Sequence, residues 1–247
     1  MFRHLSRRAK KIWAGIALLS VEMIVILTVF SLSLFAFVYL VRRVFVLGNN
    51  AFDQQIFDYL ANYVTPMNNK IMVFITYLGR HEFLIPANLL MIAYFLFVKK
   101  HRWYSIKVPA IAISSLALMF ILKRLFGRER PLIPLLEEAA GLSFPSGHAL
   151  MSVTFYGLLI YITWHSIENK PFKWTLISLL FLLILLIGFS RIYLRVHYTS
   201  DVIAGFAMGW LWIVISLKLI RQIEKRSKRE IDPVVQQPPV LETTSTD

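Results

Sequence analysis

Long apolar segments occupy most of this chain and limit what it can fold into. A membrane-spanning helix needs about 20 mostly apolar residues. The first apolar segment, residues 12–41, is interrupted by an acidic residue only at Glu22. Five shorter segments follow, some of which need flanking residues to reach that length, at 83–98, 106–122, 149–164, 174–189 and 202–219. The pattern predicts an all-α fold, a polytopic membrane helix bundle with six transmembrane helices.

The composition agrees with a membrane protein and disfavours other classes. Hydrophobic residues make up 57% of the chain and charged residues 17%, whereas soluble domains contain about 45–50% apolar and about 25% charged residues. A disordered chain, a coiled coil and an ordinary soluble enzyme are therefore disfavoured. Cysteine is absent, which excludes disulfides, thiolate metal sites and a cysteine nucleophile.

The basic residues predict how the bundle lies in the membrane. The net charge of +13 fits Lys and Arg side chains that flank membrane spans and face anionic headgroups. No basic stripe is interleaved with a soluble fold, so we expect membrane lipids and no nucleic acid as partners. Six spans place both termini on one side, and the larger share of the 27 Lys and Arg residues lies on that side. Both termini are therefore predicted to be cytoplasmic.

The segments outside the spans complete the predicted organisation. The first apolar run is too long for a signal peptide and lacks a small-residue cleavage site, so we interpret it as an uncleaved span. Residues 52–64 have helical apolar spacing and predict an amphipathic helix on the outer interface, which either covers a site or packs on the bundle. Residues 71–78 form either a half-helix or an extension of the next span. We expect one membrane domain over residues 1–226 and a disordered cytoplasmic tail over residues 227–247.

Three polar segments lie at span ends that, by the parity of the spans, share the outer face of the membrane. The first runs from Lys123 to Pro131 and contains Arg130. The second is Pro145-Ser146-Gly147-His148, at the start of the fourth span, and the third runs from Ser190 and Arg191 through His197 to Asp201. A site assembled from them would hold three cations, two histidines and one aspartate.

This inventory suits a phosphoryl group. Arginine offers a planar fork for two phosphate oxygens, and lysine adds a point charge. Ser146 is a good N-cap and Gly147 admits a close ligand, so free backbone N–H groups at this helix start can bind an anion. Asp201 follows His197 by four residues and shares its face if the segment is helical. A hydrogen bond to this carboxylate would leave the other imidazole nitrogen unprotonated, as a nucleophile requires.

The three segments together resemble the type 2 phosphatidic acid phosphatases. The pattern of that family is Lys, six residues, Arg-Pro; then Pro-Ser-Gly-His; then Ser-Arg, five residues, His, three residues, Asp, and this chain matches it without departure over residues 123–201. The resemblance implies that His197 is the nucleophile, that Asp201 orients it, and that His148 protonates the leaving group and later activates water. The implied ligands of the phosphoryl oxygens are Lys123, Arg130, Ser146, Gly147 and Arg191.

The expected function is therefore hydrolysis of lipid phosphate monoesters or diphosphates by a multi-pass protein of the cytoplasmic membrane, with the active site on the outer face. Two alternatives stay open: a lipid phosphotransferase on the same fold and an anion transporter. The transporter is disfavoured because transport sites usually lie near the bilayer midplane. No metal and no cofactor are expected, because no carboxylate cluster or histidine pair suits a metal. The sequence indicates neither which lipid is the substrate nor the oligomeric state.

Overall fold

The computed structural model describes residues 21–136 and 140–231, which form helices and loops and, within these ranges, no strand. Five stretches are long and apolar enough to cross a membrane: Met23–Val46, Pro66–Val98, Arg102–Phe126, Lys170–Tyr193 and Thr199–Arg229. The all-α prediction is confirmed. The remaining predicted span, residues 149–164, lies in a helix that is not among these five. Six spans and the orientation of the termini stay predictions.

Short connections join most of the helices, and a long loop over residues 127–146 joins α6 to α7. They are α2 (Val21–Val41), α3 (Ala51–Ala61), α4 (Pro66–Tyr77), α5 (His81–Ala93), α6 (Arg102–Phe126), α7 (Gly147–Ser166), α8 (Lys170–Tyr193) and α9 (Thr199–Arg226). Local signals set several ends. Thr65 and Asn169 cap α4 and α8 through their side chains, each just ahead of a proline, which suits a first helical turn. Gly127 ends α6 with a φ of 59°, a left-handed conformation that glycine adopts without strain.

The C-terminal helix is longer than predicted. A short π-helix, Ser227–Ile231, continues α9 beyond residue 226, and Lys228 supports it with an ion pair to Glu224 one turn earlier. An i, i+4 pair of opposite charges favours a helical turn. The domain boundary at residue 226 and the cytoplasmic tail after it stay predictions. Residues 232–247 of the predicted tail, and the first part of the first apolar segment, lie outside the described residues.

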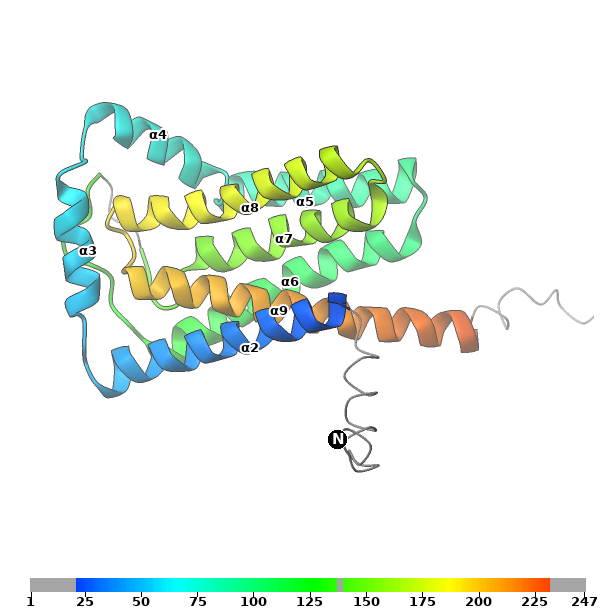
Figure 1. Ribbon diagram of the computed structural model, residues 1–247, viewed down its shortest axis with the longest axis horizontal. Coiled ribbons are helices and arrows are strands. Elements are labelled where there is room, and N and C mark those ends of the chain that lie inside the picture. The colour runs from blue at the N-terminus through cyan, green and yellow to red at the C-terminus, as the bar shows by residue number, and fades with distance from the viewer. Residues whose placement is uncertain (1–20, 137–139, 232–247) are drawn as a thin grey trace, which may run out of the picture.

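Helix α3 lies across one end of the bundle, where α6 and α8 end and α7 and α9 begin (Figure 1). The amphipathic helix predicted near residues 52–64 is thus confirmed. Its buried Phe57 and Leu60 pack against Ala149, Ile192 and Val202 of the last three helices. Residues 71–78 lie mainly in α4, a helix that packs on α8 and is separated from α5 by a turn at Leu78–Arg80. The turn separates α4 from α5, and both lie within the single stretch Pro66–Val98. The choice between a half-helix and an extension of the next span stays open.

Helix α7 packs against α6, α8 and α9. It buries polar residues such as Ser152 and Thr154 among the other helices. Small residues bring α9 close to it. A Cβ atom on Gly205 would lie 2.6 Å from the carbonyl oxygen of Ser146, and one on Gly209 would lie 3.0 Å from that of Leu150. This glycine pair, four residues apart, permits the close helix contact that positions the start of α7 beside the start of α9.

Candidate active site

The three polar segments meet at the end of the bundle that α3 crosses. Lys123 lies in the last turn of α6, and Arg130 lies in the loop that follows. Ser146, Gly147 and His148 lie at the start of α7. Arg191 lies in the last turn of α8, His197 in the loop after α8, and Asp201 in the first turn of α9. The backbone N–H of Ser146 donates to the carbonyl oxygen of Asp201 at 2.9 Å. All the predicted site residues thus lie on elements that contact one another.

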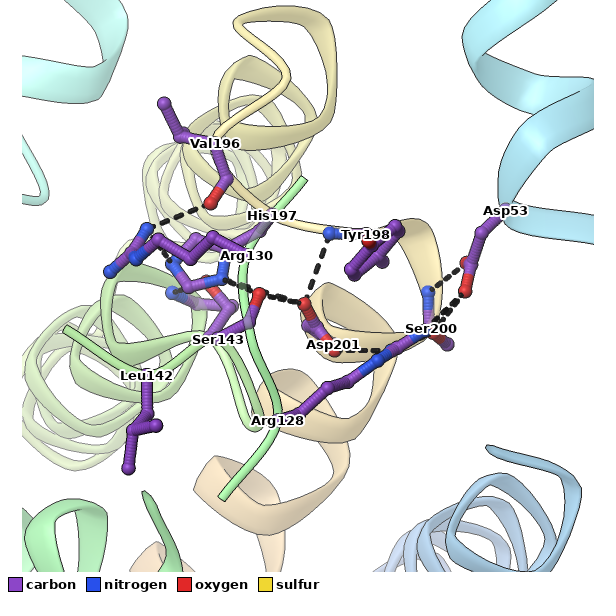
Figure 2. Close-up of polar contacts among 12 residues, drawn as sticks. Asp53, Arg128, Arg130, Leu142, Ser143, Val196, His197, Tyr198, Ser200 and Asp201 are labelled. Carbon is purple, nitrogen blue, oxygen red and sulfur yellow. Dashed lines mark hydrogen bonds and ion pairs between the residues drawn. The ribbon is translucent and has the colours of Figure 1, made fainter. Parts of the chain in front are cut away.

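His197 and Asp201 form a buried pair. Their side chains are 1% and 0% exposed, and Nδ1 of His197 lies 3.6 Å from Oδ2 of Asp201. The hydroxyl of Ser143 lies between them, donating to Oδ2 at 2.5 Å and lying 3.3 Å from Nδ1. The backbone N–H of Tyr198 donates to the same oxygen at 3.0 Å (Figure 2). Nδ1 therefore faces the carboxylate, and Nε2 faces the opposite way, toward Arg130 at 3.3 Å.

The surroundings of His197 keep its imidazole neutral. Burial lowers the pKa of His197 well below its usual range, and the positive charges of Arg130, Arg191 and Lys123 lower it further. At neutral pH the ring therefore has one unprotonated nitrogen. With Nδ1 directed at Asp201 and Ser143, the tautomer that suits the geometry carries its proton on Nδ1 and a lone pair on Nε2. This is the state in which an imidazole can act as a nucleophile.

The three cations are held by neutral oxygens. Arg130 donates to the carbonyls of Gly141 and Val196 at 2.9 and 2.7 Å, and Lys123 donates to the carbonyl of Leu142. Arg191 donates to the hydroxyl of Thr76 at 2.7 Å. Within residues 21–136 and 140–231, none of the three forms an ion pair with a carboxylate. Their charges are therefore available to an anionic ligand, while their positions are fixed.

The start of α7 completes the cluster. The side chain of Ser146 caps this helix at Ala149 N, and a Cβ on Gly147 would lie 2.6 Å from the sulfur of Met119. His148 packs against the turn between α4 and α5, where a Cβ on Gly79 would lie 3.2 Å from its ring. Nε2 of His148 and Nε of Arg191 are buried and have no hydrogen-bond partner in the described part of the chain. Such atoms are costly unless a ligand pairs with them.

Sequence reasoning missed four polar contacts around Asp201. Ser143 bridges it to His197, and Arg128 donates to its Oδ1 at 2.6 Å. Asp53 of α3 accepts from Arg128 and from Ser200. Arg128 occupies one of the six positions between Lys123 and Arg130 that the family pattern leaves open, so the pattern gives no signal for it. A signal for Asp53 existed: this acid precedes Phe57 and Leu60 by one and two helical turns, so it lies on the apolar face of α3.

The donor set offers little to a metal ion. Among the residues described here, no group of three or more His, Cys, Asp or Glu side chains is placed to hold one. The two histidines stand among arginines and a lysine, whose charges repel a cation. The same charges attract a phosphoryl dianion.

Comparison with known proteins agrees with the motif resemblance. A family model described as the PAP2 superfamily matches residues 104–225. Phosphatidylglycerophosphatase B of Bacillus subtilis is 30% identical over 169 residues, which cover 66% of this chain and 79% of the relative. An undecaprenyl-diphosphatase of Sulfolobus acidocaldarius is 28% identical over 191 residues, covering 73% and 86%. The crystal structure of a transmembrane PAP2-type phosphatidylglycerolphosphate phosphatase from B. subtilis superposes with a TM-score of 0.70 at 25% identity, covering 81% of this chain and 98% of that one.

Proposed function

The chain belongs to the PAP2 superfamily, and on that basis we propose that it hydrolyses phosphate monoesters or diphosphates of lipids at the outer face of the cytoplasmic membrane. The single observation that carries the proposal is the His197–Asp201 pair, buried among three cations that have no described carboxylate partner. The relatives named above are described as a phosphatidylglycerophosphatase and an undecaprenyl-diphosphatase, which supports a lipid phosphate as the substrate.

The reaction has two steps that use the same groups. In the first, Nε2 of His197 attacks phosphorus, a P–N bond forms, the P–O bond to the lipid breaks, and His148 in its protonated form gives a proton to the leaving oxygen. Burial and the charge of Arg191 lower the pKa of His148 well below its usual range, so this protonated form depends on the negative charge of the bound phosphate. In the second, His148 takes a proton from water, the resulting hydroxide attacks phosphorus, and the P–N bond breaks to release phosphate and restore His197. Lys123, Arg130 and Arg191 neutralise the charge that develops on the phosphoryl oxygens. Asp201 stabilises the Nδ1 proton throughout.

The proposed topology has six spans: the five stretches given above and, between the third and fourth of them, α7. Both termini lie in the cytoplasm and the α3 end lies outside. The chain has no cysteine, so single cysteines report cleanly. We expect Leu132→Cys, in a 93% exposed side chain after α6, to react with an impermeant thiol reagent added outside intact cells. Glu168→Cys, in the exposed turn between α7 and α8, is the matched control and should react only after the membrane is opened. The reverse pattern would contradict the proposed orientation.

Purified protein in detergent is expected to release inorganic phosphate from at least one member of a lipid panel without any added metal. The panel is phosphatidate, phosphatidylglycerophosphate, undecaprenyl diphosphate and a lipid A phosphate. Turnover should be unchanged within about twofold by an excess of EDTA, because the charges around phosphorus come from arginine and lysine. A strict requirement for Mg²⁺ would contradict the mechanism. A phosphorylated acceptor without free phosphate would show a phosphotransferase instead.

A further inference from the structure

A buried charge network extends from the active site to α3 (Figure 2). Nη1 of Arg128 donates to Oδ1 of Asp201 at 2.6 Å and to the hydroxyl of Ser200 at 2.7 Å. Nη2 donates to Oδ2 of Asp53 at 3.0 Å and to the side-chain oxygen of Asn50 at 2.9 Å. The guanidinium group also stacks 4.1 Å from the centre of the Tyr198 ring. It therefore lies between two carboxylates and is fixed on several sides.

Burial makes this network energetically demanding. The side chains of Arg128, Asp53 and Asp201 are 9%, 3% and 0% exposed. A buried carboxylate is costly unless it is paired and hydrogen-bonded. Arg128 supplies the charge opposite both carboxylates, so its loss would leave two buried negative charges facing each other across the same space. Such a change destabilises the ionised form of each carboxylate.

The network divides the two oxygens of Asp201 between separate partners. Arg128 binds Oδ1, which leaves Oδ2 for Ser143, for the N–H of Tyr198 and for the side of His197 that carries Nδ1. The plane of the carboxylate is therefore fixed from both ends, by Arg128 at Oδ1 and by Ser143 and the Tyr198 N–H at Oδ2. Since Asp201 orients His197 only while its oxygen faces Nδ1, the rotation of this carboxylate determines the direction of Nε2.

Helix α3 holds the other end of the network. Oδ1 of Asp53 accepts the backbone N–H of Ser200 at 2.8 Å, and its Oδ2 accepts the hydroxyl of Ser200 at 2.6 Å. Ser200 is in the first turn of α9, so Asp53 binds a free N–H at the start of that helix, where negative charge is favourable. The same carboxylate therefore fixes both Arg128 and the helix turn that carries Asp201.

We propose that Arg128 is a positioning residue for the phosphoryl transfer, acting through Asp201, and that Asp53 of α3 fixes it in place. The inference rests on the proposed function. It also gives α3 a role beyond packing, because Asp53 of α3 then helps to fix the geometry of the His197–Asp201 pair through Arg128. Arg128 itself touches no reacting atom.

A double-mutant cycle on kcat tests this proposal. Arg128→Gln is expected to lower kcat for phosphate release about 100-fold, with KM within about threefold, because misdirecting the nucleophile affects the chemical step. In an Asp201→Asn background the same change should lower kcat by less than about threefold, because the group through which Arg128 acts has lost its charge. Arg128→Lys should recover part of the loss. Arg124→Gln, an exposed arginine on the preceding turn, is the matched control and should retain full activity.

The pH dependence of kcat distinguishes a positioning role from a merely structural one, because the loss of a structural contact would not shift it. The charged and titratable groups facing His197 and Asp201 are Arg128, Lys123, Arg130, Arg191, His148 and Asp53. Removing the Arg128 cation favours the protonated forms of Asp201 and His197. The acidic limb of the kcat profile of Arg128→Gln should therefore move to higher pH, so that its deficit shrinks in alkaline buffer. Arg124→Gln should leave the limb in place.

The outcomes separate the two proposals. Equal losses from Arg128→Gln in both backgrounds, with an unmoved acidic limb, would overturn the positioning role while the phosphatase function stands. A loss confined to KM would overturn it as well. A wild-type protein that releases no phosphate from the lipid panel would overturn the proposed function, and the inference that rests on it.

Discussion

Replacing His197 with alanine is expected to abolish phosphate release, with a loss of at least about 10⁴-fold in kcat on every substrate, because the mechanism assigns the attack on phosphorus to its Nε2. The loss should be the same for a lipid phosphate and for a water-soluble aryl phosphate, since both need the nucleophile. Phosphate release by the purified protein in detergent measures it. The thermal unfolding midpoint, measured alongside, shows whether the variant folds.

His165→Ala is the matched control for this variant. His165 lies exposed near the end of α7, where its ring contacts only the carbonyl of Tyr161 and the Tyr161 ring among the described residues. It should keep wild-type activity. A His197→Ala protein that folds normally and retains more than a few per cent of wild-type kcat would mean that water attacks phosphorus directly. The role of His197 would then be phosphate binding.

His148→Ala is expected to separate substrates by their leaving groups. A lipid alkoxide needs a proton in the transition state, so kcat on a lipid phosphate should fall about 10³-fold. An aryl phosphate releases a stable phenolate, and its kcat should fall about tenfold or less. The buried Nε2 of His148, which has no partner in residues 21–136 and 140–231, is the atom from which the proton would come. The measurement is kcat for the two substrates on wild type and variant.

The comparison of substrates also tests the alternative role of His148. Equal losses on the lipid and on the aryl ester would show that His148 binds the phosphoryl oxygens and that the leaving group takes its proton elsewhere. A preserved rate on both would remove His148 from the mechanism altogether. In either case the two-step scheme would need a different general acid.

Much of the architecture could be predicted because membrane spans have a strong local signal. Apolar runs of adequate length located five helices that meet the requirements for crossing a bilayer. The amphipathic α3 was predictable from the apolar spacing within residues 52–64. Helix α7 is not among those five, and it carries polar residues such as Ser152 and Thr154 that are buried among the other helices. The π-helix Ser227–Ile231 lies in a charged segment beyond the predicted span 202–219, where no apolar pattern indicates a further turn.

The candidate site was predictable to the extent that it follows short motifs. The sequence itself shows the four-residue spacing between His197 and Asp201 and the glycine after Ser146. The network behind Asp201 cannot be seen in the sequence. Arg128 meets Asp53 across 75 positions of the chain, and only the folded arrangement of α3 against α9 shows that contact. Ser143 likewise required the geometry, because one serine among many gives no signal of a bridge.

Trapping the phosphoenzyme tests the central claim most directly. A labelled lipid phosphate is mixed with the protein, the reaction is quenched in alkali within the first turnover, and the label is located by mass spectrometry of the peptides. We predict a phosphoryl group on His197 that is stable in alkali and lost in acid, as expected of a P–N bond, and absent from His197→Ala. A label on any other residue, or turnover with no covalent label at all in quenches that span the first turnover, would contradict the account.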